Sequence, residues 1–295
     1  MLTDFYYSHP SWMVGALVIG LCAGVSILGL VGFNALVSAE MREKDNETVG
    51  LTYAIVAVIL AVLVAVITID VWDTATKARE ITTGEANQLS SLVMQSAALQ
   101  PATAQAVRAD VDQYVDLVVK REWPDQQAGK VSEEVYAPGW TVLGDLTAKL
   151  SAYEPSGLSD NATKAELLRV ADALIKARHD RILAASEHTP DDVWIMLIIA
   201  GAVSIFYTYL FGARSLRIHV AVTGLVAALI ALVFVLIIEL DYPFRGELRV
   251  SDEAFVSVKG TAAAPAAPAE SNATEPAPSA PSGAGATPAA AAPSD

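Results

Sequence analysis

The chain has 295 residues, of which 53% are hydrophobic and only 18% are charged, and its mean hydropathy is +0.42. Soluble domains carry about a quarter charged residues, so this composition excludes an ordinary soluble globular protein. The formal net charge of −14 leaves no basic excess to neutralise phosphates, and we expect no nucleic-acid partner. The single cysteine, Cys22, excludes a disulfide framework and a cysteine-rich metal site.

Four apolar runs are long enough to cross a bilayer, which takes about 20 residues in a helix. They lie at about 12–37, 48–69, 193–213 and 218–238. Each is predicted to be a helix, because backbone polar groups in a bilayer must be satisfied within the segment. The predicted fold class is therefore all-α: a polytopic membrane protein with four transmembrane helices and a helical extramembrane domain between spans two and three.

Small residues recur at four-residue spacing in every span, as at Ala57, Ala61 and Ala65 in the second. This spacing lets helix backbones approach closely in lipid. One interpretation is packing within the four-helix bundle, and the other is that one of these faces is a subunit interface.

The second span is predicted to continue out of the membrane as a helix, because neither proline nor glycine interrupts 71–83. Gly84 is a possible weak point, and Pro101 is expected to start a new helix. That new helix is predicted to end at Trp123-Pro124, from the apolar spacing that precedes this pair.

Two further helices are predicted in the domain. One is short and contains Trp140 and Leu150, and the other opens with a capping box formed by Thr163 and Glu166. No alternating β pattern of useful length is present. The predicted division of the chain is 1–71 for spans one and two, 72–192 for the helical domain, 193–239 for spans three and four, 240–259 for a juxtamembrane segment and 260–295 for a disordered tail rich in alanine and proline.

No motif in the sequence indicates catalysis. The chain has no P-loop, GxSxG or HExxH pattern, and its four histidines show no metal-ligand spacing. We therefore expect no enzyme activity, no cofactor and no bound metal.

An ion pathway is compatible with the sequence, although the centres of the spans carry no charged residue. A proton relay is disfavoured for that reason, whereas the sequence does not exclude a pore lined by apolar and hydroxyl side chains. Four helices leave no room for water between them, so conduction requires an oligomer around an axis. The candidate pore-facing residues of span two are Thr52, Tyr53, Thr68 and Asp70.

Several motifs resemble those of the bestrophin-like membrane proteins of bacteria, over about residues 10–255. The most specific is Asp-x-Pro-Phe-x-Gly after the last span, in which Tyr242 stands where the family usually has arginine. The residues that carry the resemblance are Trp72, Trp123, Pro124, Arg214, Arg217, Asp241, Pro243, Phe244, Arg245 and Gly246.

The resemblance implies a homo-oligomer in the lipid bilayer of the bacterial plasma (inner) membrane that conducts inorganic anions such as chloride. The dense acidic run with which bestrophins bind calcium is absent. The sequence does not settle on which side of the membrane the helical domain lies. The positive-inside rule places it outside, because the short loops carry the basic residues Arg42, Lys44, Arg214 and Arg217. The resemblance implies a cytoplasmic domain instead.

The motif after the last span has two interpretations. In the first it has a structural role alone, in which Pro243 stops the helix, Asp241 accepts hydrogen bonds from Arg245 or from backbone amides, and Gly246 permits a turn. In the second the turn also couples the helical domain to the spans.

Two functions follow from these observations. The leading hypothesis is an oligomeric anion channel with span two nearest the axis. The alternative is a non-conducting accessory or scaffold protein whose helical domain and tail bind partners.

Overall fold

The computed structural model describes residues 10–263, and within them it contains helices and no strand, which confirms the all-α class. The tail predicted to be disordered lies outside these residues, apart from its first few positions. In chain order the helices are α2 (Ser11–Leu36), α3 (Ala39–Glu43), α4 (Asn46–Ser96), α5 (Pro101–Leu117), the π-helix η1 (Val118–Glu122), α6 (Trp123–Gln127), α7 (Glu133–Ala152), α8 (Leu158–Ser186), α9 (Asp191–Leu210), α10 (Leu216–Asp241) and α11 (Glu253–Ala263).

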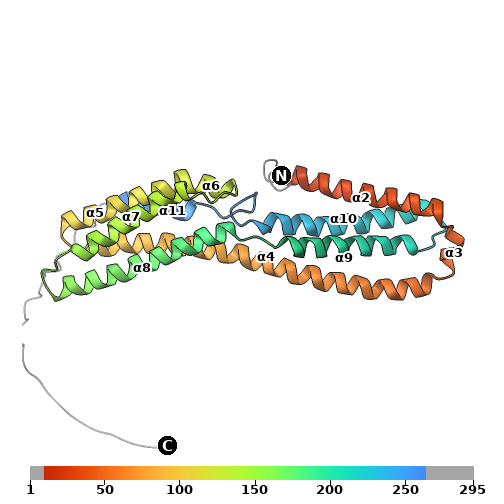
Figure 1. Cartoon of the computed structure of the whole chain (residues 1–295), viewed down its shortest axis with the longest axis horizontal. Helices are drawn as coiled ribbons and strands as arrows, with labels where there is room; N and C mark the ends of the chain where they lie inside the picture. The colour runs from red at the N-terminus through yellow and green to blue at the C-terminus, as the bar shows by residue number, and fades with distance from the viewer. Residues whose placement is uncertain (1–9, 264–295) are drawn as a thin grey trace, which may run out of the picture. The chain divides into compact units, whose positions relative to one another are not determined.

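Four of these helices, α2, α4, α9 and α10, are long and apolar enough to cross a membrane, as predicted. In Figure 1 the first half of α4 lies beside α9 and α10, and its second half packs against α5, α8 and α11. Its 51 residues run without a break through Gly84, so the predicted weak point does not interrupt the helix. A glycine in a helix costs about 1 kcal/mol relative to alanine, which the packing of α4 against other helices offsets.

The buried residues of α4 follow a spacing of three and four, the pattern of one helix face in contact with a core. This series runs from Val71 through Ala75, Ala78, Thr82, Glu85, Leu89 and Leu92 to Ser96. In the helical domain it meets apolar side chains of α5, α7 and α8. Phe255 and Val258 of α11 belong to the same core, so the segment after the last span folds back and completes it.

Two predicted helix boundaries were wrong. The helix from Pro101 does not end at Trp123-Pro124, because η1 and α6 continue it, with Pro124 in the first turn of α6, where its missing N–H is not needed. Helix α7 begins at Glu133 and contains Pro138, so it is longer than predicted.

The predicted capping box was also wrong, because α8 begins at Leu158. The hydroxyl of Thr163 donates to the carbonyl of Ser159 at 3.1 Å inside the helix. The acidic residue of the first turn is instead Asp160, whose carboxylate accepts hydrogen bonds from the backbone N–H and the hydroxyl of Ser156. A carboxylate in the first turn is favourable because the N-terminal end of a helix carries a partial positive charge.

The two short loops meet at the membrane end remote from the helical domain. The buried guanidinium of Arg42 donates to the carbonyl of Phe211 at 3.2 Å and also to the carbonyl of Tyr209 and the amide oxygen of Asn34. The side chain of Asn46 donates to the carbonyl of Gly212 and accepts from its N–H, both at 2.8 Å. These bonds hold the two helical hairpins together.

We expect Gly212→Ala to lower the free energy of unfolding by about 1–3 kcal/mol, the usual cost of overpacking. A Cβ atom at this position would lie 2.2 Å from the backbone N of Glu43 and 2.7 Å from the carbonyl oxygen of Ala39, and backbone atoms cannot move aside cheaply. Thermal unfolding in detergent micelles measures the effect. Gly144→Ala is the control, because its Cβ would meet no atom within 4 Å. Equal melting temperatures for the two variants would contradict the prediction.

Candidate functional site

The four residues of span two that were predicted to face a pore do not share one face of α4. Thr52 and Asp70 are exposed and lie five helical turns apart on one side. Tyr53 points elsewhere, with its ring stacked 6.2 Å from that of Tyr207 and edge-on to Phe211 at 5.9 Å. Thr68 is half-buried, and its hydroxyl donates to the carbonyl of Val64 at 2.8 Å.

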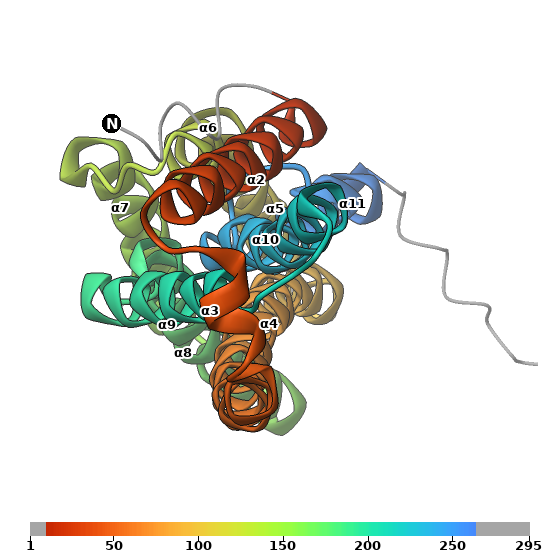
Figure 2. The ribbon, with the colours of Figure 1, turned by 90° about the vertical axis from the view of Figure 1, so that its right-hand side faces the viewer.

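Beside Thr52 and Asp70, a strip of α4 is left uncovered along the helix, and we call it the open face. It consists of exposed side chains that recur every three or four residues through both halves of the helix. Its membrane half is apolar and contains Leu51, Ile55, Val58, Val62 and Ile69. Its other half continues with Asp73, Glu80, Thr83, Asn87 and Met94. In Figure 2 the membrane half of α4 lies at one edge of the helices, on the side away from α2.

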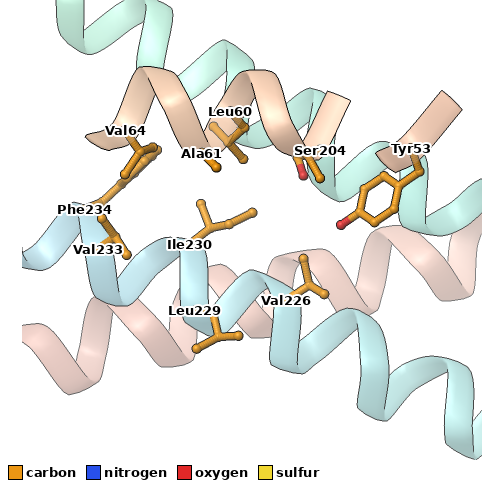
Figure 3. A pocket seen from close by; sticks show the side chains of 11 residues that line it. Tyr53, Leu60, Ala61, Val64, Ser204, Val226, Leu229, Ile230, Val233 and Phe234 are labelled. Atoms are coloured by element: carbon orange, nitrogen blue, oxygen red, sulfur yellow. The ribbon is translucent and has the colours of Figure 1, made fainter. Parts of the chain in front are cut away.

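An apolar groove of about 260 Å³ lies between α4 and α10, on another side of α4 (Figure 3). On the α4 side it is lined by Ala57 and Ala61, whose small side chains leave the space, and on the α10 side by Ile230 and Phe234. Tyr53 and the buried Ser204 supply its few polar atoms. Ala57 and Ala61 of the small-residue series therefore line a groove, whereas Ser204 of the same series is buried within the chain.

The core of the helical domain contains a buried cluster of four charged side chains, which we call the ion cluster: Glu85 of α4, Glu122 of η1, and Arg178 and Arg181 of α8. All four side chains are fully buried. Arg178 donates to both carboxylate oxygens of Glu122, at 2.9 and 3.0 Å. Arg181 donates to Glu85 at 2.7 and 3.2 Å and to Glu122 at 2.8 Å. Two acids and two bases balance, so the cluster adds no net charge to the core.

Neighbouring groups close the ion cluster on its remaining sides. The hydroxyl of Tyr114 donates to Glu85 and accepts from Arg178 at 3.0 Å. Arg178 also donates to the carbonyl of Tyr136 at 2.8 Å, and its guanidinium lies 4.6 Å from the ring centroid of Trp140. Both terminal nitrogens of Arg178 thus have partners, whereas its Nε and the Nη1 of Arg181 are buried without a hydrogen-bond partner among the described residues.

Gly139 has no side chain, and this leaves space for the side chains of the ion cluster. A Cβ atom there would lie 2.4 Å from Nη2 of Arg178 and 2.7 Å from a carboxylate oxygen of Glu122. A larger residue at this position is therefore incompatible with the charge pairing as it stands.

The electrostatics keep the two arginines of the ion cluster charged. Burial lowers the pKa of Arg181, but the charges of Glu85 and Glu122 outweigh it, and the pKa is raised well above its ordinary value. Burial, followed by the negative charge of Glu85, raises the pKa of Tyr114. Burial likewise raises the pKa of Tyr136 to about 12. The arginines stay protonated and the tyrosines stay neutral over the physiological range.

The π-helix η1 places Glu122 in this cluster. A π-helix turn shifts the side chains that follow it relative to the preceding α-helix. Here the turn ends with both Glu122 and Trp123 buried, whereas Lys120 and Arg121 stay in contact with solvent.

Sequence reasoning missed the ion cluster, although a signal for it is present. Arg178 and Arg181 continue the apolar series Leu167, Val170, Ala171 and Leu174 of α8 at the same spacing. Glu85 stands in the same way in the apolar series of α4. A charged residue in a core position of an amphipathic helix predicts a buried partner, because an unpaired charge is too costly there.

The turn after α10 packs against the base of the helical domain. The ring of Phe244 is buried and lies 5.5 Å from that of Trp123, and the ring of Phe255 lies 5.8 Å from it on α11. Arg181 in turn lies 5.5 Å from the Phe255 ring centroid. One contact chain thus joins the turn to the ion cluster.

Two further contacts fix this turn. Asp241 accepts a hydrogen bond from the backbone N–H of Thr189 at 2.7 Å, so its partner is a backbone amide of the α8–α9 link. Gly246 has φ +80°, a conformation that favours glycine. The buried Arg245 lies against Gly129, where an added Cβ would come within 2.6 Å of its Nη1 atom.

The remaining motif residues are placed apart from this turn. Pro124 follows Trp123 in α6, and Trp72 is 55% exposed at the domain end of the α4 span. Arg214 pairs with Glu43 at 2.9 Å, and Arg217 is exposed, both at the opposite membrane end. In residues 10–263 no three histidine, cysteine or acidic side chains form a group that suits a metal ion.

Comparisons with known proteins agree with this architecture. The family model of the Bestrophin-like domain matches residues 20–255. Among solved structures, a single-substitution variant of a bacterial bestrophin homologue from Klebsiella pneumoniae matches with a TM-score of 0.64 and 13% identity, over 84% of this chain and 98% of that chain. A second variant of that homologue matches with a TM-score of 0.63 and 14% identity, over 83% and 97%. A third structure, described as a membrane protein, has a TM-score of 0.58 and 14% identity, over 81% and 97%.

No curated protein matches the chain. The family model covers well over half of the sequence, and the matches to the two bestrophin homologue structures extend over nearly the full length of those chains. The four membrane-length helices agree with the resemblance noted in the sequence. The chain is an integral membrane protein and belongs to the bestrophin-like family.

Proposed function

We propose that the chain forms a homo-oligomeric ion channel in which α4 lies nearest the axis. The observation that carries this proposal is the open face of α4, which runs from Leu51 to Met94 through the membrane half and the domain half of one helix. In this proposal 1–71 and 193–239 form the membrane part, and 72–192 with 240–259 form the attached domain. The membrane is the bacterial inner membrane.

The open face supports an axial position because α4 is the helix at the centre of the protomer's packing. It contacts α5 and α8 to α11, yet one side of it stays uncovered along its length. Copies arranged around an axis would turn these sides toward a common path. Ala61 and Ala65 are exposed small residues toward one edge of that face and leave room for a neighbouring helix to approach.

The nature of a pore along this face follows from its side chains. In the membrane half it would be lined by branched apolar residues such as Ile55, Val62 and Ile69. Narrow apolar constrictions conduct or block according to whether they are wetted, and they need no buried charge. Such a pore would be gated by small changes in the spacing of the α4 helices.

Family membership supports an anion as the permeating ion, since bestrophins are anion channels. A second candidate, a cation, is favoured by one observation: the open face carries Asp73 and Glu80 just beyond the membrane half, with exposed carboxylates. In an oligomer these would form acidic rings, which concentrate cations at a pore entrance.

Neutralising both acids tests the sign of the ion. If the rings line the path, Asp73→Asn with Glu80→Gln is expected to lower the cation-to-anion permeability ratio by about three- to tenfold, equivalent to about 1 kcal/mol of lost attraction. Reversal potentials under a salt gradient in planar bilayers give the ratio. Asp112→Asn with Glu154→Gln removes the same charge from exposed positions outside the open face and serves as control. An unchanged ratio would place the two acids away from the path.

The proposal as a whole is tested by purification and reconstitution. Light scattering in detergent is expected to show a closed oligomer, and liposomes containing it are expected to show chloride or sodium flux. A monomer or dimer without flux of either ion would contradict the channel and favour the accessory or scaffold function.

A further inference from the structure

A polar groove lies at the domain end of the membrane spans, between α4 and the link from α8 to α9. Its main hollow, of about 400 Å³, is lined by Asp70, Thr74, Lys77, Glu187 and His188, with Leu240 and Asp241 at the end of α10. A second hollow of about 320 Å³ shares Thr74, Lys77 and Glu187 with it and extends along α8. We call the two together the boundary groove.

The boundary groove lies at the level of lipid headgroups. Between Glu47 and Asp70 α4 carries no charged residue, and α9 carries none after Asp192. The groove begins where these uncharged runs end. Trp72, 55% exposed, and Tyr242 lie at the same ends of the spans, and both are residue types that favour the membrane interface.

The charges that face the boundary groove are unsatisfied within the protomer. Lys77, Asp70 and Glu187 are exposed, and among the side chains that the structure describes none of them forms an ion pair. The neighbouring charges are already used, since Lys176 pairs with Asp180 at 3.1 Å and Asp241 accepts the N–H of Thr189. One free cation and two free carboxylates thus line one hollow.

We propose that the boundary groove binds the headgroup of a zwitterionic phospholipid with a primary ammonium, of the ethanolamine type. The phosphate would pair with Lys77, and the ammonium would donate to the carboxylates of Asp70 and Glu187. An anionic phosphoglycerol headgroup matches less well, because it brings no positive charge to the two carboxylates. A choline headgroup has no N–H to donate to them.

The surroundings of the groove suit the rest of such a lipid. Val66 and Ile69 of α4 are about 60% exposed and lie toward the membrane from Asp70, where acyl chains would extend. The headgroup would touch both α4 and Glu187, which precedes the turn contact between Thr189 and Asp241. A bound lipid would therefore stabilise the junction between the spans and the helical domain.

Lipid binding to the purified full-length protein tests the proposal. Native mass spectrometry in detergent, with phosphatidylethanolamine, phosphatidylcholine and phosphatidylglycerol of identical acyl chains, gives the affinity for each. We expect the ethanolamine lipid to bind most tightly, and Lys77→Gln and Glu187→Gln each to weaken it about five- to tenfold, the loss of one partly exposed charge contact. Lys44→Gln and Glu47→Gln, at the opposite membrane boundary, are the matched controls and are expected to leave the affinity unchanged.

Three results would overturn the proposal. Equal affinity for the three lipids indicates only non-specific contact with the spans. Preference for the glycerol lipid, lost in Lys77→Gln alone, indicates a simple anion contact. Weakening by the control variants as much as by the groove variants places the site elsewhere. The assay does not depend on ion conduction, so it stands apart from the test of the channel.

Discussion

Replacing Arg181 by leucine is expected to lower the free energy of unfolding by about 3–5 kcal/mol, the typical cost of removing one partner from a buried ion pair. The substitution leaves Glu85 fully buried with only the Tyr114 hydroxyl as a partner, and it removes one of the two arginines from Glu122. Leucine fills much of the space, so the loss reports the charge rather than a cavity. Denaturation in detergent, followed by the fluorescence of the buried Trp123 and by circular dichroism, measures it.

Two further variants separate charge from packing. Arg169 lies on the same helix and pairs with Glu166 at the surface, so Arg169→Leu is expected to cost less than about 1 kcal/mol. Glu85→Leu combined with Arg181→Leu removes both partners of one ion pair, so no unpaired carboxylate is left at position 85. The double variant is expected to be more stable than Arg181→Leu alone. A double variant as unstable as the sum of its two single variants would show that the pairing contributes little.

Charged thiol reagents are expected to reduce ion flux by more than about tenfold when Val62 is replaced by cysteine in a Cys22→Ser background. The native chain has one cysteine, so that background carries no other thiol. Val62 is 58% exposed on the open face, and in the proposed oligomer a cysteine there meets water. Only a thiol in contact with water ionises and reacts, because the thiolate is the nucleophile.

The control for this experiment is Leu28→Cys in the same background. Leu28 is 72% exposed on α2, which lies on the opposite side of the helices from the membrane half of α4 in Figure 2. A thiol there faces lipid and is expected to stay unmodified, although its exposure in the protomer is at least as great. Equal modification at both positions, or none at Val62→Cys, would contradict the axial position of α4.

The contacts around Trp123 bear on how the helical domain meets the membrane part. Phe244, at the turn after α10, packs on Trp123, which immediately follows Glu122 of the ion cluster. Both interpretations of the motif fit this packing. Movement of the turn would press on the core of the domain, and a variant that keeps the fold but alters flux, such as Phe244→Leu, separates coupling from a structural role alone.

Much of the fold follows from the sequence alone. Each span is a long uncharged run whose backbone a bilayer forces into a helix. The lengths and periods of these runs were enough to identify four spans, the helical domain and the continuation of span two out of the membrane, but not its passage through Gly84 without a break. One missed boundary lies at Trp123, where a π-helix turn and α6 continue the helix, and the other at Thr163, which lies inside α8 because that helix begins at Leu158. Local sequence leaves such alternatives nearly equal in energy.

The site residues were harder to predict, for a physical reason. Composition and periodicity report which side chains are apolar, but they do not report which polar side chains meet across different helices. Only the tertiary structure brings Glu85, Glu122, Arg178 and Arg181 together from three helices, because their pairing depends on distances between segments up to 96 residues apart. It likewise decides that Tyr53 and Thr68 turn away from the side of α4 that stays open, since a helix face becomes exposed or covered only when its neighbours pack.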